Sequence, residues 1–393
     1  MNITKKRDRK LSNPLLLTPL ASTSTGSHAG TPIMRAVVFC EGNFAKGDGK
    51  TANGLIRHSD FYQIVSVVDS TCAGQDSGEI LDGQKNGIPI FSDLKQAVTA
   101  VESTPHTLIY GVAPANGRLP KAHREIILEA ISLGLNIVCG LHEYLTDDSE
   151  ILTASQAKKV TVSDIRKPPP NSKMRVFDGS VADMDTIRIA VLGTDCAIGK
   201  RTTATILAAA LVEKGIHTVL IGTGQTGLMQ GARYGIAMDA LAPQFCCGQL
   251  EGEIVKAYRE QHPKVILIEG QGALSHPAFC TSAFILRGSQ PHGVVLQHAP
   301  KRIARCDFPH MDMPTPETEI ALIESFADTK VIGLTLNHEG MKSDFEIQTW
   351  TEQLAAQLDL PVTDALSRPN NELVNMVTSA FPSLAATLQA NQA

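Results

Sequence analysis

The sequence has few aromatic residues, no long apolar run and no excess of positive charge. Aromatic residues make up 5% of its 393 residues, and the formal net charge is −5. No apolar run approaches the roughly 20 residues that a membrane-spanning helix needs. A negative net charge gives no general attraction to nucleic acid or to anionic lipid. These absences argue against a membrane protein and against a protein that binds polyanions over its whole surface.

The 8 cysteines lack the spacings that are typical of zinc sites or redox motifs. No CxxC pair occurs, and no cysteine pair is followed by a histidine pair at zinc-finger spacing. Cys40 and Cys139 follow apolar residues, which is how small core residues are usually placed. We therefore expect reduced thiols, no bound metal and a cytoplasmic location.

Short apolar segments alternate with helical patterns along most of the chain. With 31 glycines and few aromatic residues, this pattern is typical of parallel sheets covered by helices. It predicts an α/β fold of two domains, a Rossmann-like parallel sheet followed by a P-loop NTPase-like parallel sheet. The predicted divisions are a mobile tail at residues 1–33, the Rossmann-like domain at residues 34–170 and the P-loop domain at residues 171–393.

The segment after the predicted strand at residues 186–192 has the features of a phosphate-binding loop. Gly193 and Gly199 flank it, Lys200 follows, and a helical pattern continues to about Glu213. Glycines let backbone N–H groups turn toward an anion, and the helix start and the lysine add positive charge. The predicted cofactor-binding residues are Gly193, Thr194, Asp195, Cys196, Ala197, Ile198, Gly199, Lys200, Arg201 and Thr202.

The loop departs from the common P-loop in two ways. Residues 194–198 place five residues between the glycines instead of four, which resembles dethiobiotin synthetase. Arg201 stands where a Ser or Thr normally helps to hold Mg²⁺. An arginine offers a fork for a phosphate instead, although Thr202 remains a possible source of the hydroxyl. Such a loop can hold a nucleotide-like carrier without hydrolysing it.

From about residue 35 to about residue 385 the chain resembles the D-glutamate N-acetyltransferase family. The phosphate loop carries the resemblance together with the segments at residues 47–55, 69–74, 224–227 and 268–277. The resemblance implies acetyl transfer from acetyl-CoA to the amine of D-glutamate. Coenzyme A suits the loop because it carries phosphates but reacts at a distant thioester, so no metal is expected.

Acetyl transfer needs a base for the amine, donors for the oxyanion and cations for the substrate carboxylates. The catalytic candidates are Glu269, at a predicted strand end beside glycines, and His276, in a Ser-His-Pro turn. Each has a structural alternative, since Glu269 can bond the loop and His276 can bond a loop carbonyl. The remaining candidates bind substrate through donors or cations: Gln225, Thr226, Gln271, Arg233 as the first choice of clamp, Arg287, Arg302 and Arg305.

Three further patterns carry less weight. Glu251 and Glu253 are possible catalytic acids, but we prefer the interpretation that they stabilise the start of a helix. An acyl-cysteine at Cys246 or Cys247 is disfavoured because no histidine is adjacent. Residues 47–51 resemble a second phosphate loop without a preceding strand, so we expect a loop over the cleft between the domains.

Two other functions remain open: an ATP-dependent ligase or kinase resembling dethiobiotin synthetase, and a nucleotide-sensing module without catalysis. A dependence on Mg²⁺ would favour the first of these. The expected partners are a small acidic amino acid and further copies of the chain, with no nucleic acid and no membrane.

Overall fold

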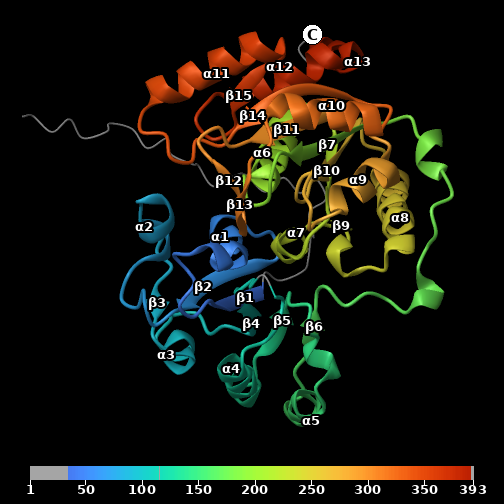
Figure 1. Ribbon diagram of the computed structural model, residues 1–393. Coiled ribbons are helices and arrows are strands. Elements are labelled where there is room, and N and C mark those ends of the chain that lie inside the picture. Colours follow the sequence, from blue (N-terminus) through green and yellow to red (C-terminus); the bar gives the residue numbers. More distant parts are fainter. Residues whose placement is uncertain (1–33, 115, 391–393) are drawn as a thin grey trace, which may run out of the picture.

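The computed structural model describes residues 34–114 and 116–390, and Figure 1 shows its two α/β halves. The predicted mobile tail at residues 1–33 lies outside the described residues. Within the described ranges, no helix is both long and apolar enough to cross a membrane.

The N-terminal half is built on a six-stranded sheet in which all strands are parallel. The strand order is β3-β2-β1-β4-β5-β6, the order of the Rossmann fold. The strands are β1 (Met34–Phe39), β2 (Tyr62–Val68), β3 (Ile90–Phe91), β4 (Thr107–Tyr110), β5 (Asn136–Cys139) and β6 (Val162–Asp164). The helices of this half are α1 (Lys50–Arg57), α2 (Ser77–Asp82), α3 (Leu94–Thr99), α4 (Lys121–Ser132) and α5 (Ser149–Lys158).

The C-terminal half is built on a seven-stranded parallel sheet in the order β15-β14-β11-β7-β10-β8-β9. Its strands are β7 (Ile187–Gly193), β8 (Thr218–Gly222), β9 (Tyr234–Gly235), β10 (Val265–Glu269), β11 (Gly293–His298), β14 (Lys330–Leu336) and β15 (Val362–Asp364). Its helices are α6 (Lys200–Glu213), α7 (Gln225–Gln230), α8 (Pro243–Gln261), α9 (Thr281–Ser289), α10 (Pro316–Phe326), α11 (Asp344–Leu358), α12 (Asn370–Ala380) and α13 (Pro382–Ala390). A short antiparallel pair, β12 (Ala304–Arg305) and β13 (Phe308–Asp312), lies outside this sheet.

The central strand β7 is apolar on both sides because helices cover both faces of its sheet. Ala190 and Leu192 pack in one core with residues of α8, α9 and α10. Ile189 and Val191 pack in a second core with residues of α6, α12 and α13. Successive side chains of a strand point to opposite faces, so a continuous apolar run fills both cores. The predicted fold class, two α/β domains of Rossmann-like and P-loop type, is confirmed.

Residues 165–186 connect β6 to β7, and the predicted boundary between residues 170 and 171 falls within them. The segment lies against α8, where Glu251 accepts hydrogen bonds from the backbone N–H groups of Asp178 and Val181 at 3.0 and 3.2 Å. Glu251 also pairs with Arg175 at 3.2 Å. Its buried carboxylate therefore holds the connecting segment in place.

Helix α7 belongs to the C-terminal half but packs into the N-terminal half beside α1 (Figure 1). Its Met229 is part of the hydrophobic core of the N-terminal half. Arg166 strengthens this contact, because its guanidinium donates to the carbonyl of Gly140, to Gln225 at 2.7 Å and to Asp239 at 2.8 Å. One buried cation thus joins groups from both halves.

We predict that Arg166→Ala lowers the free energy of unfolding by about 2–3 kcal/mol, because it leaves Asp239 and the Gly140 carbonyl without their partner. Urea unfolding monitored by circular dichroism measures the change. The matched control is Lys167→Ala, which removes an exposed ion pair with Asp147 inside one half and should cost about 0–1 kcal/mol. Equal losses in the two variants would contradict the role of Arg166.

Candidate functional site

The loop between β7 and α6 has the backbone that a phosphate-binding loop requires. Ala197 and Gly199 have positive φ angles of 51° and 98°, which turn the chain sharply before the helix. Gly199 is the N-cap of α6 and offers no side chain to the first helical N–H groups. These N–H groups, at the positive end of the helix, are therefore available to an anion.

Lys200 is buried beneath this loop. Its ammonium donates to the backbone carbonyl of Asp195, and burial lowers its pKa to about 8. A phosphate that accepted a hydrogen bond from this ammonium would favour its charged form. The lysine is thus placed to respond to a bound anion.

Polar side chains at the carboxyl ends of neighbouring strands hold the loop from below. From β11, His298 Nδ1 lies 2.9 Å from Thr194 Oγ1, and Gln297 accepts from Thr203 Oγ1 at 2.6 Å. Just after β14, Asn337 donates to the carbonyl of Ile198 at 3.0 Å. The loop is therefore fixed before any ligand arrives.

Arg302 holds the outer side of the loop. Its guanidinium donates to the carbonyls of Cys196 and Ala197 at 2.8 and 3.2 Å and to Asp195 Oδ2 at 3.1 Å. The backbone N–H of Cys306 donates to the same carboxylate oxygen at 2.7 Å. Arg302 was predicted as a carboxylate clamp, and the structure gives it a role in shaping the loop.

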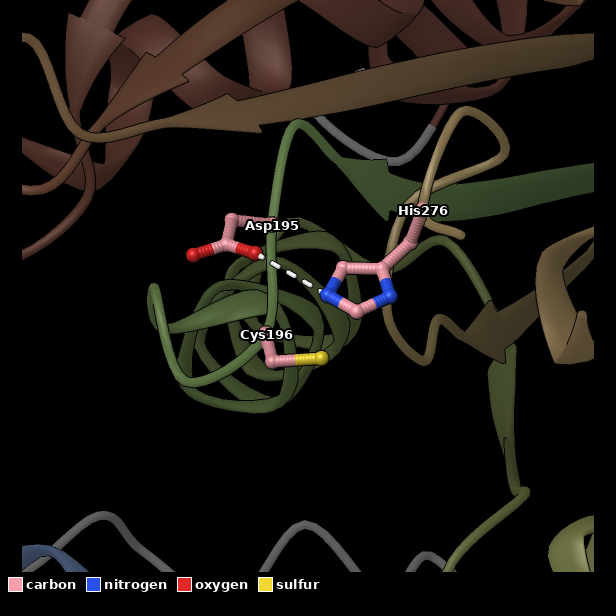
Figure 2. Close-up of side chains that lie close together, drawn as sticks. All are labelled: Asp195, Cys196 and His276. Atoms are coloured by element: carbon pink, nitrogen blue, oxygen red, sulfur yellow. Dashed lines mark ion pairs between the residues drawn. The ribbon is translucent and has the colours of Figure 1, made fainter. Parts of the chain in front are cut away.

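Figure 2 shows that Asp195 and Cys196, on the loop, lie beside His276. His276 Nε2 is 3.8 Å from Asp195 Oδ1, and neither of these buried atoms has a hydrogen-bond partner. His276 Nδ1 accepts a hydrogen bond from the backbone N–H of Ala278 at 3.2 Å. A neutral ring that accepts at Nδ1 carries its proton on Nε2, so Nε2 faces Asp195 as a donor.

The surroundings of His276 keep its ring neutral. Burial lowers its pKa below the ordinary value, and Arg305 and Lys200 act in the same direction against the opposing charge of Asp195. Phe279 stacks on the ring at a centroid distance of 4.7 Å. His276 is therefore better suited to donate a hydrogen bond from Nε2 than to accept a proton there. A catalytic role for His276 stays a prediction.

Asp195, Cys196 and His276 also form a group whose ligand atoms all lie within 4.8 Å of one another. A carboxylate, a thiol and an imidazole together suit a zinc-like ion. Burial raises the pKa of the Cys196 thiol, however, and the cations of Lys200 and Arg302 adjoin Asp195. Both conditions oppose a divalent cation at this place.

Glu269, the last residue of β10, is fixed by two donors. Its Oε2 accepts from the backbone N–H of Thr223 at 3.1 Å and from Arg201 Nη1 at 3.2 Å. The predicted substrate residue Gln271 donates to the carbonyl of Thr223. Glu269 thus bonds the segment after β8 and the first turn of α6, a structural role close to the alternative considered for it, and its role as a base stays a prediction.

The other predicted substrate residues are not all at the loop. Gln225 and Thr226 are at the contact with α1, where both bond Thr51 at 3.4 and 3.0 Å. Arg233 pairs with Glu260 at 3.0 Å, and the Arg287 guanidinium lies over the Phe326 ring at 4.8 Å. The charged groups of these two arginines are thus engaged elsewhere in the C-terminal half.

Residues 47–51, expected to form a loop, are instead a 3₁₀ turn at Gly47–Gly49 and the start of α1. Thr51 brings this turn to α7, and the charge of Lys50 is near enough to the phosphate loop to lower the pKa of Cys196, against the larger effect of burial. These contacts put the segment next to α7 of the other half; that it lies over a cleft between the halves stays a prediction. Burial raises the pKa of Cys246 to about 11, which leaves it an unreactive thiol.

Glu319, which no sequence motif singles out, is fully buried in the first turn of α10. It accepts from the backbone N–H groups of Leu274 and Ser275 at 2.6 and 3.2 Å and from the Ser275 hydroxyl. Arg305 donates to that hydroxyl at 2.9 Å. Glu319 therefore positions the turn that carries His276, although the two residues are far apart in the sequence.

Fold and site together define a two-domain protein with a Rossmann-like half and a phosphate loop in its P-loop half. Residues 175–374 match the family model described as "Domain of unknown function (DUF1611_C) P-loop domain", and residues 70–168 match "Domain of unknown function (DUF1611_N) Rossmann-like domain". The chain belongs to this DUF1611 family.

Two curated relatives carry the name D-glutamate N-acetyltransferase. The protein from Pseudoalteromonas sp is 33% identical over 72% of this chain and 84% of its own length. The protein from Tritonibacter scottomollicae is 27% identical over 70% of this chain and 81% of its own length. The resemblance drawn from the sequence motifs is thereby confirmed.

A solved structure of a DUF1611 family protein from Anabaena variabilis is similar over both halves. It is 29% identical, has a TM-score of 0.81 and covers 88% of this chain and 99% of its own. The combination of the two domains is therefore a property of the family.

The buried His298 predicts a pH dependence of stability. Burial lowers its pKa from 6.5 to about 4, so between these values the unfolded chain binds more protons than the folded chain. The free energy of unfolding should fall as the pH falls from 6.5 to 4. In His298→Asn this fall should be smaller by up to about 3 kcal/mol.

Urea unfolding at pH 7, 5.5 and 4.5 would measure how the free energy of unfolding changes with pH in the parent protein and in His298→Asn. Each unit of difference in pKa between the folded and unfolded states corresponds to about 1.4 kcal/mol. The exposed His310, on β13, provides the control variant His310→Asn, which should keep the slope of the parent protein. Identical slopes for all three proteins would contradict the prediction.

Proposed function

We propose that this protein transfers the acetyl group of acetyl-CoA to the amine of D-glutamate, with the phosphate loop anchoring the phosphates of coenzyme A. The observation that carries the proposal is the uncapped start of α6 with Lys200 beneath it, in a chain whose curated relatives are named D-glutamate N-acetyltransferase. An anionic carrier is what such a loop binds best.

The loop would act as an anchor and take no part in the chemistry. The N–H groups at the start of α6 donate to phosphate oxygens, and the Lys200 ammonium exchanges the Asp195 carbonyl for a phosphate. The thioester of acetyl-CoA is remote from its phosphates, so the reaction can take place at some distance from them. Binding energy gained at the loop then fixes the thioester in position.

The reaction forms a C–N bond and breaks a C–S bond. The amine of D-glutamate attacks the thioester carbon, the oxyanion collapses, and coenzyme A leaves as a thiol with the proton that the amine loses. The predicted catalytic residues would act on the two reacting groups: His276 as a donor for the oxyanion and Glu269 as the acid for the ammonium group. Arg305, whose buried Nη1 has no hydrogen-bond partner, is a candidate for binding a substrate carboxylate.

A free-thiol assay tests the proposal directly. Acetyl-CoA mixed with D-glutamate should release thiol in the presence of the protein, and L-glutamate and other amino acids provide the comparison panel. Thiol release that requires MgATP, or none with any amine, would contradict it and favour the ATP-dependent alternative or a sensing role respectively.

Lys200→Ala should weaken the binding of coenzyme A by about tenfold or more, because it removes a buried charge that bonds phosphate. Isothermal titration calorimetry with coenzyme A measures the dissociation constant. The matched control is Lys214→Ala at the exposed C-terminal end of the same helix, which should bind as the parent does. Unchanged affinity in Lys200→Ala would place the cofactor elsewhere.

A further inference from the structure

Arg201 occupies the position in the first turn of α6 where the common phosphate loop has a Ser or Thr. The hydroxyl of that residue helps to bind the Mg²⁺ that accompanies a nucleotide, and an acid at the end of a neighbouring strand supports the ion. Here the corresponding acid is Glu269, at the end of β10, which pairs with β7 in the sheet. Both positions of the usual metal site can thus be found in this chain.

The arginine and the acid are bonded to each other. Arg201 Nη1 lies 3.2 Å from Glu269 Oε2, and the two side chains are only 19% and 8% exposed. Arg201 Nε donates to Gln230 Oε1, which fixes the plane of the guanidinium. Among the described residues, Nη2 makes no hydrogen bond, so one arm of the fork remains available.

Gly227 of α7 provides the room for this pair. A Cβ at position 227 would collide with Arg201 Nη1 and lie 2.7 Å from Glu269 Oε2. Helix α7 therefore approaches the pair as closely as a backbone without a side chain allows. The guanidinium sits in a site shaped for it, beside Lys200 at the start of the helix.

We propose that the Arg201 guanidinium, held by Glu269 and Gln230, takes the place of Mg²⁺ at this phosphate loop. The loop is then selective for phosphate esters and anhydrides that carry no metal, such as the ADP portion of coenzyme A, and discriminates against MgATP. Nη2 is the donor that meets the phosphate. The inference deepens the proposed function, on which its choice of ligand rests.

Because both are positively charged, Mg²⁺ and the Arg201 guanidinium cannot bind Glu269 at the same time. An Mg²⁺ ion that bound Glu269 would have to displace Arg201, leaving a half-buried guanidinium without its partner and next to a divalent cation. A phosphate that carries no metal contacts Lys200, Arg201 and the start of the helix. It has no metal ion to give up when it binds. The Arg201–Glu269 pair therefore opposes the binding of Mg²⁺ and favours a phosphate that carries no metal.

The test titrates coenzyme A and ADP by calorimetry, once with EDTA and once with excess Mg²⁺. The parent protein should bind each ligand with dissociation constants that agree within about twofold between the two buffers. Arg201→Thr, which restores the usual hydroxyl and frees Glu269, should bind about tenfold more weakly in EDTA and recover most of this loss in Mg²⁺.

Two variants separate charge from geometry. Arg201→Lys keeps the cation and should stay independent of Mg²⁺. Gly227→Ala pushes the guanidinium off Glu269 and should weaken binding in both buffers by about threefold or more. Arg259→Thr, at an exposed position of α8, is the control for the loss of an arginine and should match the parent. Melting temperatures show that each variant is folded.

Three results would overturn the inference: parent affinity that rises severalfold with Mg²⁺, Arg201→Thr affinity in EDTA equal to that of the parent, or a loss in Arg201→Thr that Mg²⁺ does not restore. A parent protein that binds both ligands without Mg²⁺ but releases no thiol from acetyl-CoA would leave the inference intact and refute the acetyl transfer. Absence of any binding by the parent would overturn both.

Discussion

Positive charge gathered at one end of a helix is the constraint on which the rest of this site depends. Lys200, Arg201 and Arg302 converge on the loop between β7 and α6, and each is at least partly buried. A buried cation is costly unless it is paired, and the loop is built from the pairings: a carbonyl for Lys200, Glu269 for Arg201 and Asp195 for Arg302. On the proposed function, a bound phosphate would add a further negative charge at the helix start.

Much of this organisation can be predicted from the sequence because it is local. The apolar run before Gly193, the glycines and Lys200 lie within a few residues of one another, so strand, loop and helix follow from their order. Glu269 and Gln297 follow the same rule, since Glu269 ends β10, Gln297 is the residue before the last in β11, and the carboxyl ends of these strands meet at one edge of the sheet. The resemblance to a known family further predicts that a Rossmann-like domain and a P-loop domain occur together in one chain.

The remaining parts depend on contacts between distant segments, which no local pattern encodes. Arg233 was preferred as a clamp for its nearness to residues 224–227, yet Glu260 on α8 pairs with it. The bonding of His276 depends on the backbone of Ala278 and on Glu319, which fix a turn that has no helical or strand periodicity. Arg302 acts on residues about a hundred positions earlier, and its neighbour β12–β13 is too short to show alternation.

Gln230 gives the contact between the halves a second meaning. Its amide nitrogen donates to the carbonyls of Gly54 and His58 at the end of α1, at 2.6 and 2.9 Å, while its oxygen accepts from Arg201. Gln230 thus bonds α1 of the Rossmann-like half and Arg201 of the P-loop half at the same time. The two halves are therefore coupled through this side chain: a change in the length or tilt of α1 would alter the position of Gln230 and, through it, the orientation of Arg201.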